Sequence, residues 1–267
     1  MISFPNAKIN IGLHVVSKRT DGYHNLETVF YPVQLADALE VVETRRRKFT
    51  FSGIPIDGAI ENNLIYKAWK LLSEDFNIPP VHFHLHKAIP FGAGLGGGSS
   101  DAAFALKMLN DFFKLELTMA QLEKYASQIG ADCSFFMHNK PLIAKGIGDQ
   151  FSPLEIDLSA YQIIIVKPNV SVSTPEAYRN VAPAKPEFDL TTLPKLPVEE
   201  WKNEVKNDFE NSVFLQYPQI KKLKDLLYSA GAVYASMSGS GSAVYGIFRH
   251  SPTNIDKLIP EGVFIYP

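Results

Sequence analysis

Apolar and polar residues alternate one by one along two segments in the first third of the chain. From Ile9 to Val15, apolar residues alternate with Asn, Gly and His, and from Val81 to Lys87 they alternate with three histidines. A period of two is typical of a β-strand with one buried face. Apolar stretches at 29–35 and 39–42, and the segment 48–52, predict further strands. We therefore expect the beginning of the chain to be rich in β-structure.

Apolar positions three to four residues apart predict helices in much of the remaining chain. Thr118 and Gln121 form a capping box at the start of one helix, which Gly130 ends. The other predicted helices lie at 63–73, directly after the glycines at 92–98, near 198–216 and at 218–230, and a short one precedes the last strand. Later strands are predicted at 163–166, 232–236, 243–248 and 263–266. Strands and helices mix without regular βαβ alternation, which indicates an α+β protein of two lobes.

Length and composition agree with this organisation. At roughly 150 residues per domain, 267 residues correspond to about two domains, which we place at 1–155 and 156–267. Hydrophobic residues make up 46% and charged residues 20%, which excludes a disordered or coiled-coil protein. The net charge of −2 argues against nucleic acid as the main partner, because phosphate binding leaves a basic footprint.

The cysteine content and the N-terminus predict a cytoplasmic protein. The single cysteine, Cys133, excludes an internal disulfide and is typical of a reducing compartment. The first residues lack a basic region followed by an apolar one, so we read no signal peptide. No stretch approaches the roughly 18 apolar residues of a membrane span, and we expect no membrane association.

Five of the 17 glycines fall between Gly92 and Gly98, between a predicted strand and a predicted helix. Glycines let the backbone approach a ligand closely, and the free N–H groups at a helix N-terminus attract an anion such as phosphate. The pattern G-x-x-x-x-G-K-[ST] is absent because no lysine precedes Ser99 or Ser100. A tight surface turn and a dinucleotide-binding G-x-G-x-x-G loop are weaker alternatives, the latter because the preceding strand carries three histidines on one face.

Three ordered segments resemble the small-molecule kinases named after galactokinase, homoserine kinase, mevalonate kinase and phosphomevalonate kinase, the GHMP kinases. The central one runs from Pro90 to Ala103, with the insert Gly-Leu-Gly-Gly-Gly-Ser-Ser. The others are Pro5–Leu13 with Asp21–His24, and Ser238–Ser242. Shorter matches are Gly130–Asp132, Lys145–Gly148 and Asn207–Glu210.

The resemblance implies a two-lobed GHMP-kinase fold. Its N-terminal lobe would be a β-rich ATP-binding domain like the second domain of ribosomal protein S5, and its C-terminal lobe a ferredoxin-like α+β domain. The implied cofactors are ATP and Mg²⁺, with Ser100 as the metal ligand. The implied phosphate-binding residues are Pro90, Gly92, Ala93, Gly94, Leu95, Gly96, Gly97, Gly98, Ser99 and Ser100.

The same resemblance implies a catalytic pair. Asp132 would be the general base that accepts the proton of the attacking hydroxyl. Lys8 would keep that carboxylate ionised and stabilise the nucleophilic oxygen. From position alone, Asp132 is equally well explained as the N-cap of a short helix, and Lys8 as a solvated residue at a strand end. The sequence does not decide whether Asp132 removes the proton early or Lys8 mainly gives electrostatic help.

The doubled glycine insert and Tyr23-His24 are similar to one branch of the family, whose substrate is 4-diphosphocytidyl-2-C-methyl-D-erythritol, phosphorylated on its 2-hydroxyl in the non-mevalonate route to isoprenoid precursors. By this resemblance Tyr23 would stack on the cytosine, His24 would hydrogen-bond its edge, and Tyr178 would be a second aromatic for the base. Core or turn aromatics are the alternative. Asn10 would bind the erythritol hydroxyls and Lys145 a phosphate or the cytidine end.

Gly239 would let the backbone pass close to the substrate. Two other functions remain open: a GHMP kinase for another alcohol, such as homoserine or mevalonate, and a catalytically silent nucleotide-binding member. We expect a small-molecule substrate and a monomer or weak homodimer.

Three features carry no predicted site. His82 and His86 lie about 13 Å apart on a strand, too far to share one metal with His84. The basic run 45–48 is expected to be a solvated hairpin. The proline-rich segment 183–197 contains no usable motif.

Overall fold

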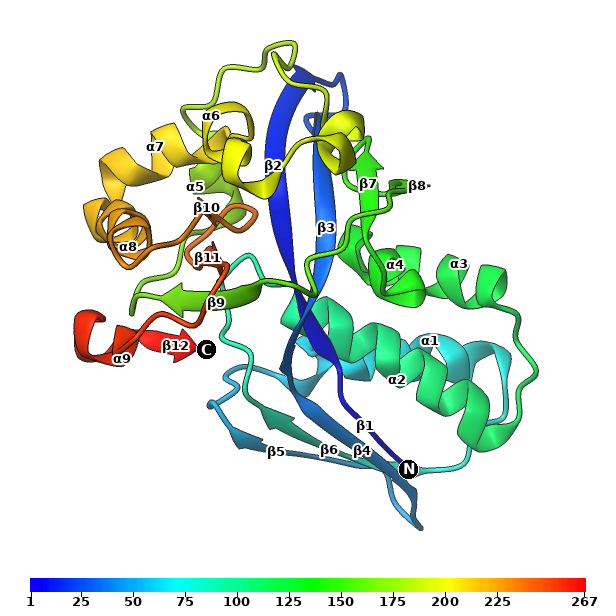
Figure 1. Cartoon of the computed structure of the whole chain (residues 1–267). Helices are drawn as coiled ribbons and strands as arrows, with labels where there is room; N and C mark the ends of the chain where they lie inside the picture. The colour runs from blue at the N-terminus through cyan, green and yellow to red at the C-terminus, as the bar shows by residue number, and fades with distance from the viewer. The chain divides into compact units, whose positions relative to one another are not determined.

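The computed structural model describes residues 1–267 and forms two compact units (Figure 1). Neither unit is one continuous segment. The first contains Met1–Lys8, Pro32–Phe91 and Gly96–Lys140, and the second contains Ile9–Tyr31, Gly92–Leu95 and Pro141–Pro267. The predicted domains, 1–155 and 156–267, are each one continuous segment, whereas the chain passes between these two units several times. The predicted domain boundary therefore stays a prediction.

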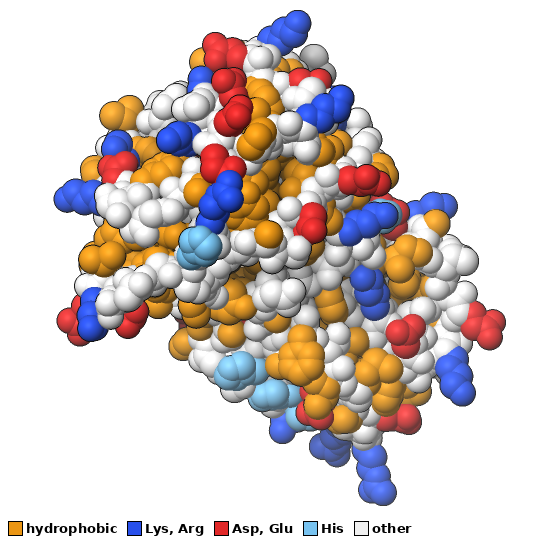
Figure 2. Space-filling model, in the orientation of Figure 1, with side chains coloured by type: hydrophobic (Ala, Val, Ile, Leu, Met, Phe, Trp, Pro, Cys, Tyr) orange, Lys and Arg blue, Asp and Glu red, His pale blue; other side chains and the backbone are white.

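The first unit has a four-stranded sheet in the order β1-β4-β6-β5. Its strands are β1 (Ile2–Ser3), β4 (Ala38–Glu43), β6 (Val81–Lys87) and β5 (Lys48–Gly53). Strand β6 runs antiparallel to β4 and parallel to β5. The predicted alternation along β6 is confirmed, since Val81, Phe83 and Leu85 are buried. Its histidines hydrogen-bond hydroxyl groups of β5 and gather on one part of the surface (Figure 2).

The helices of the first unit pack on one another around the longest of them. They are η1 (Ile60–Asn62), α1 (Leu64–Asp75), α2 (Gly97–Phe113), α3 (Met119–Ile129) and α4 (Ala131–His138). Helix α2 contacts α1, α3 and α4 as well as β4. The capping box predicted at Thr118 is present, with Gln121 as its partner. Helix α4 was not predicted as a separate element.

The second unit contains one further sheet and most of another, two of whose strands also include residues of the first unit. One has the order β2-β3-β7-β8, from β2 (Asn6–Lys18), β3 (His24–Ala36), β7 (Leu142–Lys145) and β8 (Gln150–Pro153). The other has the order β10-β11-β9-β12, from β10 (Tyr234–Met237), β11 (Val244–Phe248), β9 (Gln162–Lys167) and β12 (Phe264–Tyr266). Strands β7 and β8, of four residues each, were not predicted from the sequence.

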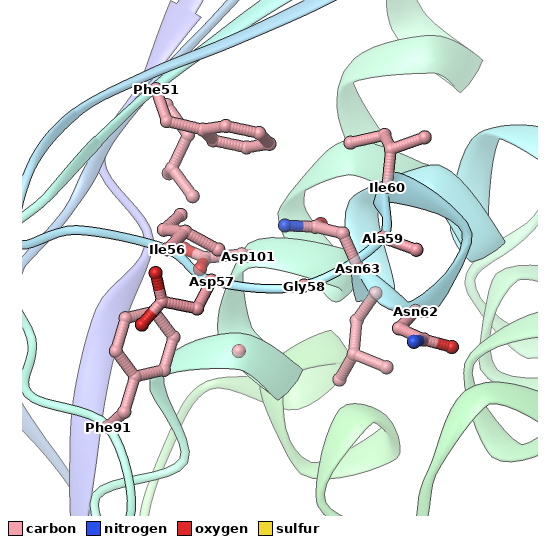
Figure 3. Close-up of a pocket in the computed structure, with 13 residues that line it drawn as sticks. Phe51, Ile56, Asp57, Gly58, Ala59, Ile60, Asn62, Asn63, Phe91 and Asp101 are labelled. Atoms are coloured by element: carbon pink, nitrogen blue, oxygen red, sulfur yellow. The ribbon is translucent and has the colours of Figure 1, made fainter.

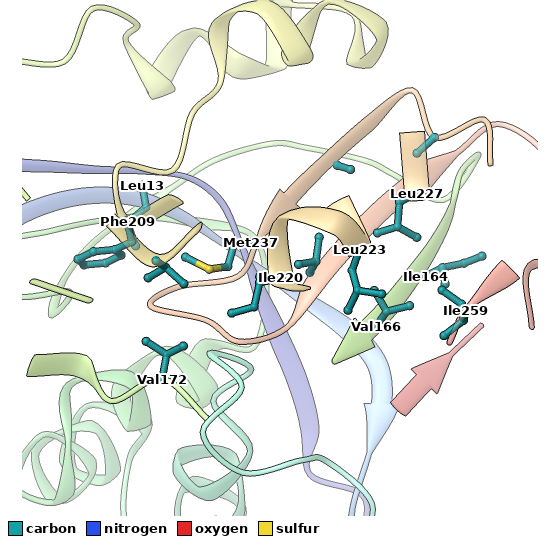
Figure 4. Packing of buried hydrophobic residues seen from close by; sticks show 14 of the residues in the cluster. Leu13, Ile164, Val166, Val172, Phe209, Ile220, Leu223, Leu227, Met237 and Ile259 are labelled. Atoms are coloured by element: carbon teal, nitrogen blue, oxygen red, sulfur yellow. The ribbon is translucent and has the colours of Figure 1, made fainter. Parts of the chain in front are cut away.

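The second unit has one large apolar core (Figure 4). Ile164 and Val166 of β9 lie against Leu223 and Leu227 of the helix at 218–229, and Met237 of β10 lies beside Ile220. The helical elements are α5 (Thr174–Tyr178), η2 (Leu190–Lys195), η3 (Val198–Glu200), α6 (Trp201–Glu204), α7 (Phe209–Gln216), α8 (Pro218–Ser229) and α9 (Ile255–Leu258).

The helical segment predicted near 198–216 is interrupted between α6 and α7. There Leu13 donates its N–H to the Lys206 carbonyl, and Asp208 donates its N–H to the Leu13 carbonyl. These backbone hydrogen bonds to β2 replace helical ones, so tertiary pairing overrides local propensity. Across the whole chain, no helix is both long enough and apolar enough to cross a membrane.

Candidate active site

The glycine cluster uses glycine for two different physical reasons. Gly92, Gly94 and Gly96 have positive φ angles of 56°, 71° and 70°, which side chains rarely adopt. In the second unit, a Cβ added to Gly94 would lie 1.9 Å from the Ser238 carbonyl oxygen. In the first unit, a Cβ on Gly97 would lie 2.8 Å from Ile89 Cγ2. A tight surface turn does not require such close packing, so the alternative of a plain turn is not supported.

The first unit carries the part of the loop that opens helix α2. This helix begins at Gly97, and its N-cap, Gly96, provides no side-chain hydrogen bond. The first backbone N–H groups of a helix have no partner within it and carry a partial positive charge. They are a ready site for phosphate.

The two serines of this segment differ in their surroundings. The Ser100 Oγ is buried without a hydrogen-bond partner, whereas the Ser99 side chain is only half-buried. A buried polar atom without a partner calls for an explanation, and an unused hydroxyl oxygen is a ligand type that Mg²⁺ accepts. Ser100 therefore fits the predicted metal-ligating role better than Ser99 does. Burial raises the pKa of the Cys133 thiol to about 12.

Lys8 and Asp132 lie together in the first unit. Lys8 Nζ is 3.5 Å from Asp132 Oδ2, with the lysine buried and the aspartate side chain 35% exposed. The cap of α4 is Gly130, with no side-chain cap hydrogen bond, so Asp132 is not the N-cap that its position allowed. Burial lowers the pKa of Lys8, opposed by the charge and hydrogen bond of Asp132. A partly exposed carboxylate held beside a buried ammonium can accept a proton from a bound hydroxyl.

This pair lies against the phosphate loop. A Cβ on Gly96 would be 3.2 Å from Lys8 Cε and 3.0 Å from the Phe136 ring, so the lysine side chain passes directly beside the residue that caps α2. A cation in this position can neutralise negative charge on a phosphate held at the helix N-terminus.

A cavity of about 310 Å³ adjoins the same helix N-terminus (Figure 3). Its lining residues are Phe51, Ile56, Asp57, Gly58, Ala59, Ile60, Asn62, Asn63, Leu64, Leu85, Phe91, Gly98 and Asp101. Figure 3 shows Phe51 and Phe91 on one side and Asn62 on the other, with the Asn63 amide directed between them. Flat apolar walls with a few amide groups suit a heteroaromatic ring. Of the lining residues only Gly98 was predicted from the sequence, because the others come from segments far apart in the chain.

A buried charged cluster, also unforeseen, lies beside the cavity. The Lys87 ammonium donates to Asp37 and to Asp101 Oδ2, and all three residues are at most 3% exposed. Burial raises the pKa of Asp101 to about 8, and the Lys87 charge opposes this shift. Asp101 is therefore easier to protonate than an ordinary aspartate.

In the second unit, Asn10 and Gly239 lie close together. Asn10 is buried, and its Nδ2 donates to Thr28 Oγ1 at 2.9 Å. Its backbone N–H donates to Ser238 Oγ at 3.2 Å. A Cβ on Gly239 would be 3.2 Å from Asn10 Oδ1. The predicted close backbone approach at Gly239 is therefore toward Asn10, and its approach to a substrate stays a prediction.

Three predicted aromatic residues occupy different environments in the second unit. His24 and Tyr178 stack with ring centroids 4.7 Å apart and an interplanar angle of 20°. Tyr178 also packs its ring edge-to-face with Phe209. Tyr23 is 63% exposed. Lys145, the last residue of β7, pairs with Glu27 at 2.7 Å. The substrate-binding roles of these residues stay predictions.

Two segments of the chain match domains of a known enzyme family. Residues 63–140 match the GHMP kinases N terminal domain, and residues 187–258 match the GHMP kinases C terminal domain. A relative from Parabacteroides distasonis is 57% identical over 257 residues, which cover 96% of this chain and 94% of the relative. This chain belongs to the GHMP kinases. The predicted α+β GHMP-kinase fold and an ATP-dependent phosphotransferase activity are thereby confirmed.

The similar GHMP kinases include several with one name. The Parabacteroides relative is named 4-diphosphocytidyl-2-C-methyl-D-erythritol kinase, as is a Bacteroides fragilis relative, 53% identical over all of this chain and 98% of its own length. A crystal structure of 4-(cytidine 5'-diphospho)-2C-methyl-D-erythritol kinase superposes with a TM-score of 0.84 at 32% identity, covering 99% of this chain and 98% of that one. A mevalonate kinase structure, with a TM-score of 0.75 at 16% identity, shares the fold.

Proposed function

We propose that this GHMP kinase transfers the terminal phosphate of ATP to the 2-hydroxyl of 4-diphosphocytidyl-2-C-methyl-D-erythritol, a step in the synthesis of isoprenoid precursors. The observation that carries the kinase chemistry is the Lys8–Asp132 pair at 3.5 Å, with Lys8 against Gly96 of the phosphate loop. The names of relatives that are more than half identical over nearly the full length support the substrate.

ATP would bind to the first unit. Its phosphates would lie against the backbone N–H groups at the start of α2, and its base would enter the cavity between Phe51 and Phe91. Ser100 would supply one oxygen to Mg²⁺, which neutralises phosphate charge during the transfer. Because the cavity adjoins Gly98 in the first turn of α2, a base bound there would be continuous with phosphates at the helix N-terminus.

Asp132 and Lys8 would carry the proton transfer and the charge stabilisation. The substrate oxygen forms a bond to the γ-phosphorus while its proton passes to Asp132. The bond from the γ-phosphorus to the bridging oxygen breaks, and ADP leaves. Lys8 stabilises the negative oxygen, and its buried position strengthens that interaction relative to water.

The cytidyl-bearing alcohol would use residues of the second unit. Tyr23 is exposed enough to stack on cytosine, and such stacking contributes about 1–3 kcal/mol per base. The His24–Tyr178 stack would present the imidazole to the base edge. Asn10 and Gly239 would face the erythritol, and Lys145 a phosphate or the cytidine end. We further propose a cytoplasmic location, which agrees with the single free cysteine, and a monomer or weak homodimer.

The test is a phosphotransfer assay with ATP, Mg²⁺ and the cytidyl substrate, run beside homoserine, mevalonate and the cytidyl-free methylerythritol. We expect turnover only with the cytidyl compound, and equal turnover on a cytidyl-free alcohol would refute the assignment. In Asp132→Asn we expect kcat to fall by about 10²–10⁴ with ATP affinity unchanged. Turnover retained in Asp132→Asn would exclude the general-base role, and ATP binding without any turnover by the wild type would favour a silent nucleotide-binding protein.

A further inference from the structure

Both ends of the phosphate loop are tied to the buried charged cluster of the first unit. Lys87 is the last residue of β6, directly before the segment that leads into the loop, and Asp101 lies in the beginning of α2, directly after it. The Lys87 ammonium donates to Asp101 Oδ2 at 2.7 Å and to Asp37 Oδ2. One lysine thus links the strand before the loop to the helix after it.

The other carboxylate oxygen of Asp37 binds the backbone directly before the loop. Asp37 Oδ1 accepts the backbone N–H of Ala88 at 2.6 Å and that of Ile89 at 2.8 Å. These are the two residues between β6 and Pro90. Asp37 itself lies between β3 and β4, so a third segment of the chain is attached to the same point.

The Lys87 ammonium also lies next to the first turn of α2. A Cβ added to Gly97 would be 3.0 Å from Lys87 Nζ and 2.8 Å from the Ile89 side chain. Gly97 therefore packs closely against both Lys87 and Ile89. Movement of either residue would change the direction of the free N–H groups of the helix. Buried ion pairs give little net stability compared with apolar residues of the same volume, so their value lies in the geometry they impose.

We propose that Asp37, Lys87 and Asp101 form a loop clamp, in which Asp37 and Lys87 are positioning residues that hold the phosphate loop in its ATP-binding conformation. This inference rests on the proposed role of the loop as the phosphate site. The clamp contacts the backbone at the entry to the loop, whereas Lys8 pairs with Asp132. It acts on ATP binding and leaves the transfer step to the catalytic pair.

The test compares Asp37→Ala and Asp37→Asn with Asp111→Ala, which removes an exposed aspartate farther along α2. ATP affinity is measured directly by calorimetry, and KM for ATP, KM for the alcohol and kcat by ADP release. We expect Asp37→Ala to raise Kd and KM for ATP at least tenfold, with kcat at saturating ATP and KM for the alcohol within threefold. Asp37→Asn, which keeps an acceptor for the Ala88 and Ile89 amides, is expected to show a smaller increase. Asp111→Ala should match the wild type.

A purely structural role gives a different pattern, because loss of folded protein lowers apparent kcat and leaves KM unchanged. A lower kcat with an unchanged KM for ATP in folded Asp37→Asn would overturn the clamp, and so would an unchanged Kd for ATP in Asp37→Ala. Hydrogen exchange adds a second readout: the Ala88 and Ile89 amides should exchange at least tenfold faster in Asp37→Ala and by a smaller factor in Asp37→Asn, with β11 amides unchanged. Equal protection of these two amides also overturns it. If the wild type does not bind ATP, the proposed function fails first, and the two failures are distinguished.

Discussion

Replacing Gly94 by alanine tests whether the loop depends on close backbone packing. Gly94 has a φ angle of 71°, and its added Cβ would lie 1.9 Å from the Ser238 carbonyl oxygen, where ordinary contact begins near 3.4 Å. The left-handed conformation costs about 1–2 kcal/mol for a residue with a Cβ. Displacing a backbone carbonyl adds about 1–3 kcal/mol, as other overpacking substitutions do. Gly94→Ala should therefore destabilise the protein by about 2–5 kcal/mol.

Urea denaturation followed by circular dichroism measures this change. With a slope of about 2–3 kcal/mol per molar urea, the midpoint should fall by about 0.7–2.5 M. Ser238 Oγ also donates to the Gly94 carbonyl and accepts the Asn10 N–H, so its displacement is expected to raise KM for the alcohol as well.

Gly231→Ala is the matched control. Gly231 has a φ angle of 99°, and an added Cβ would meet nothing within 4 Å. Gly231→Ala therefore carries the free-energy cost of a left-handed backbone conformation but no steric overlap. We expect a loss of about 1–2 kcal/mol and unchanged kinetics. If Gly94→Ala lowers the midpoint no more than Gly231→Ala does, the packing argument for the glycine cluster is wrong.

Two further predictions concern buried groups. Lys87→Met leaves the Asp37 and Asp101 carboxyls without their cation and should cost about 3–5 kcal/mol of stability in the same urea assay, and a loss below about 1 kcal/mol would contradict the ion-pair description. Burial raises the pKa of Cys133 to about 12, so near pH 8 only about one thiol in 10⁴ is ionised. A thiol reagent at pH 8 should therefore label the native protein no faster than it unfolds but label the urea-unfolded protein readily, and rapid native labelling would show that the thiol is accessible.

Some features were predictable because they depend on residues close together in the sequence. The alternation along Val81–Lys87 identifies the strand and its buried face, since successive side chains of a strand point to opposite sides. The capping box at Thr118 is likewise a local arrangement of one turn. In contrast, the segment 205–208 leaves the helical path because it pairs with β2, and no local pattern reports a partner so distant along the chain.

By itself, the sequence determined that a glycine loop opens a helix, that its residues resemble those of GHMP kinases, and which residue types are present for phosphate transfer. Only the tertiary structure decided that Asp132 faces Lys8 rather than capping α4, and that Lys87 before the loop pairs with Asp101 after it and with Asp37 from a distant segment. The physical reason is that backbone conformation is set largely by neighbouring residues. Burial and pairing of charges depend on which distant segments pack together.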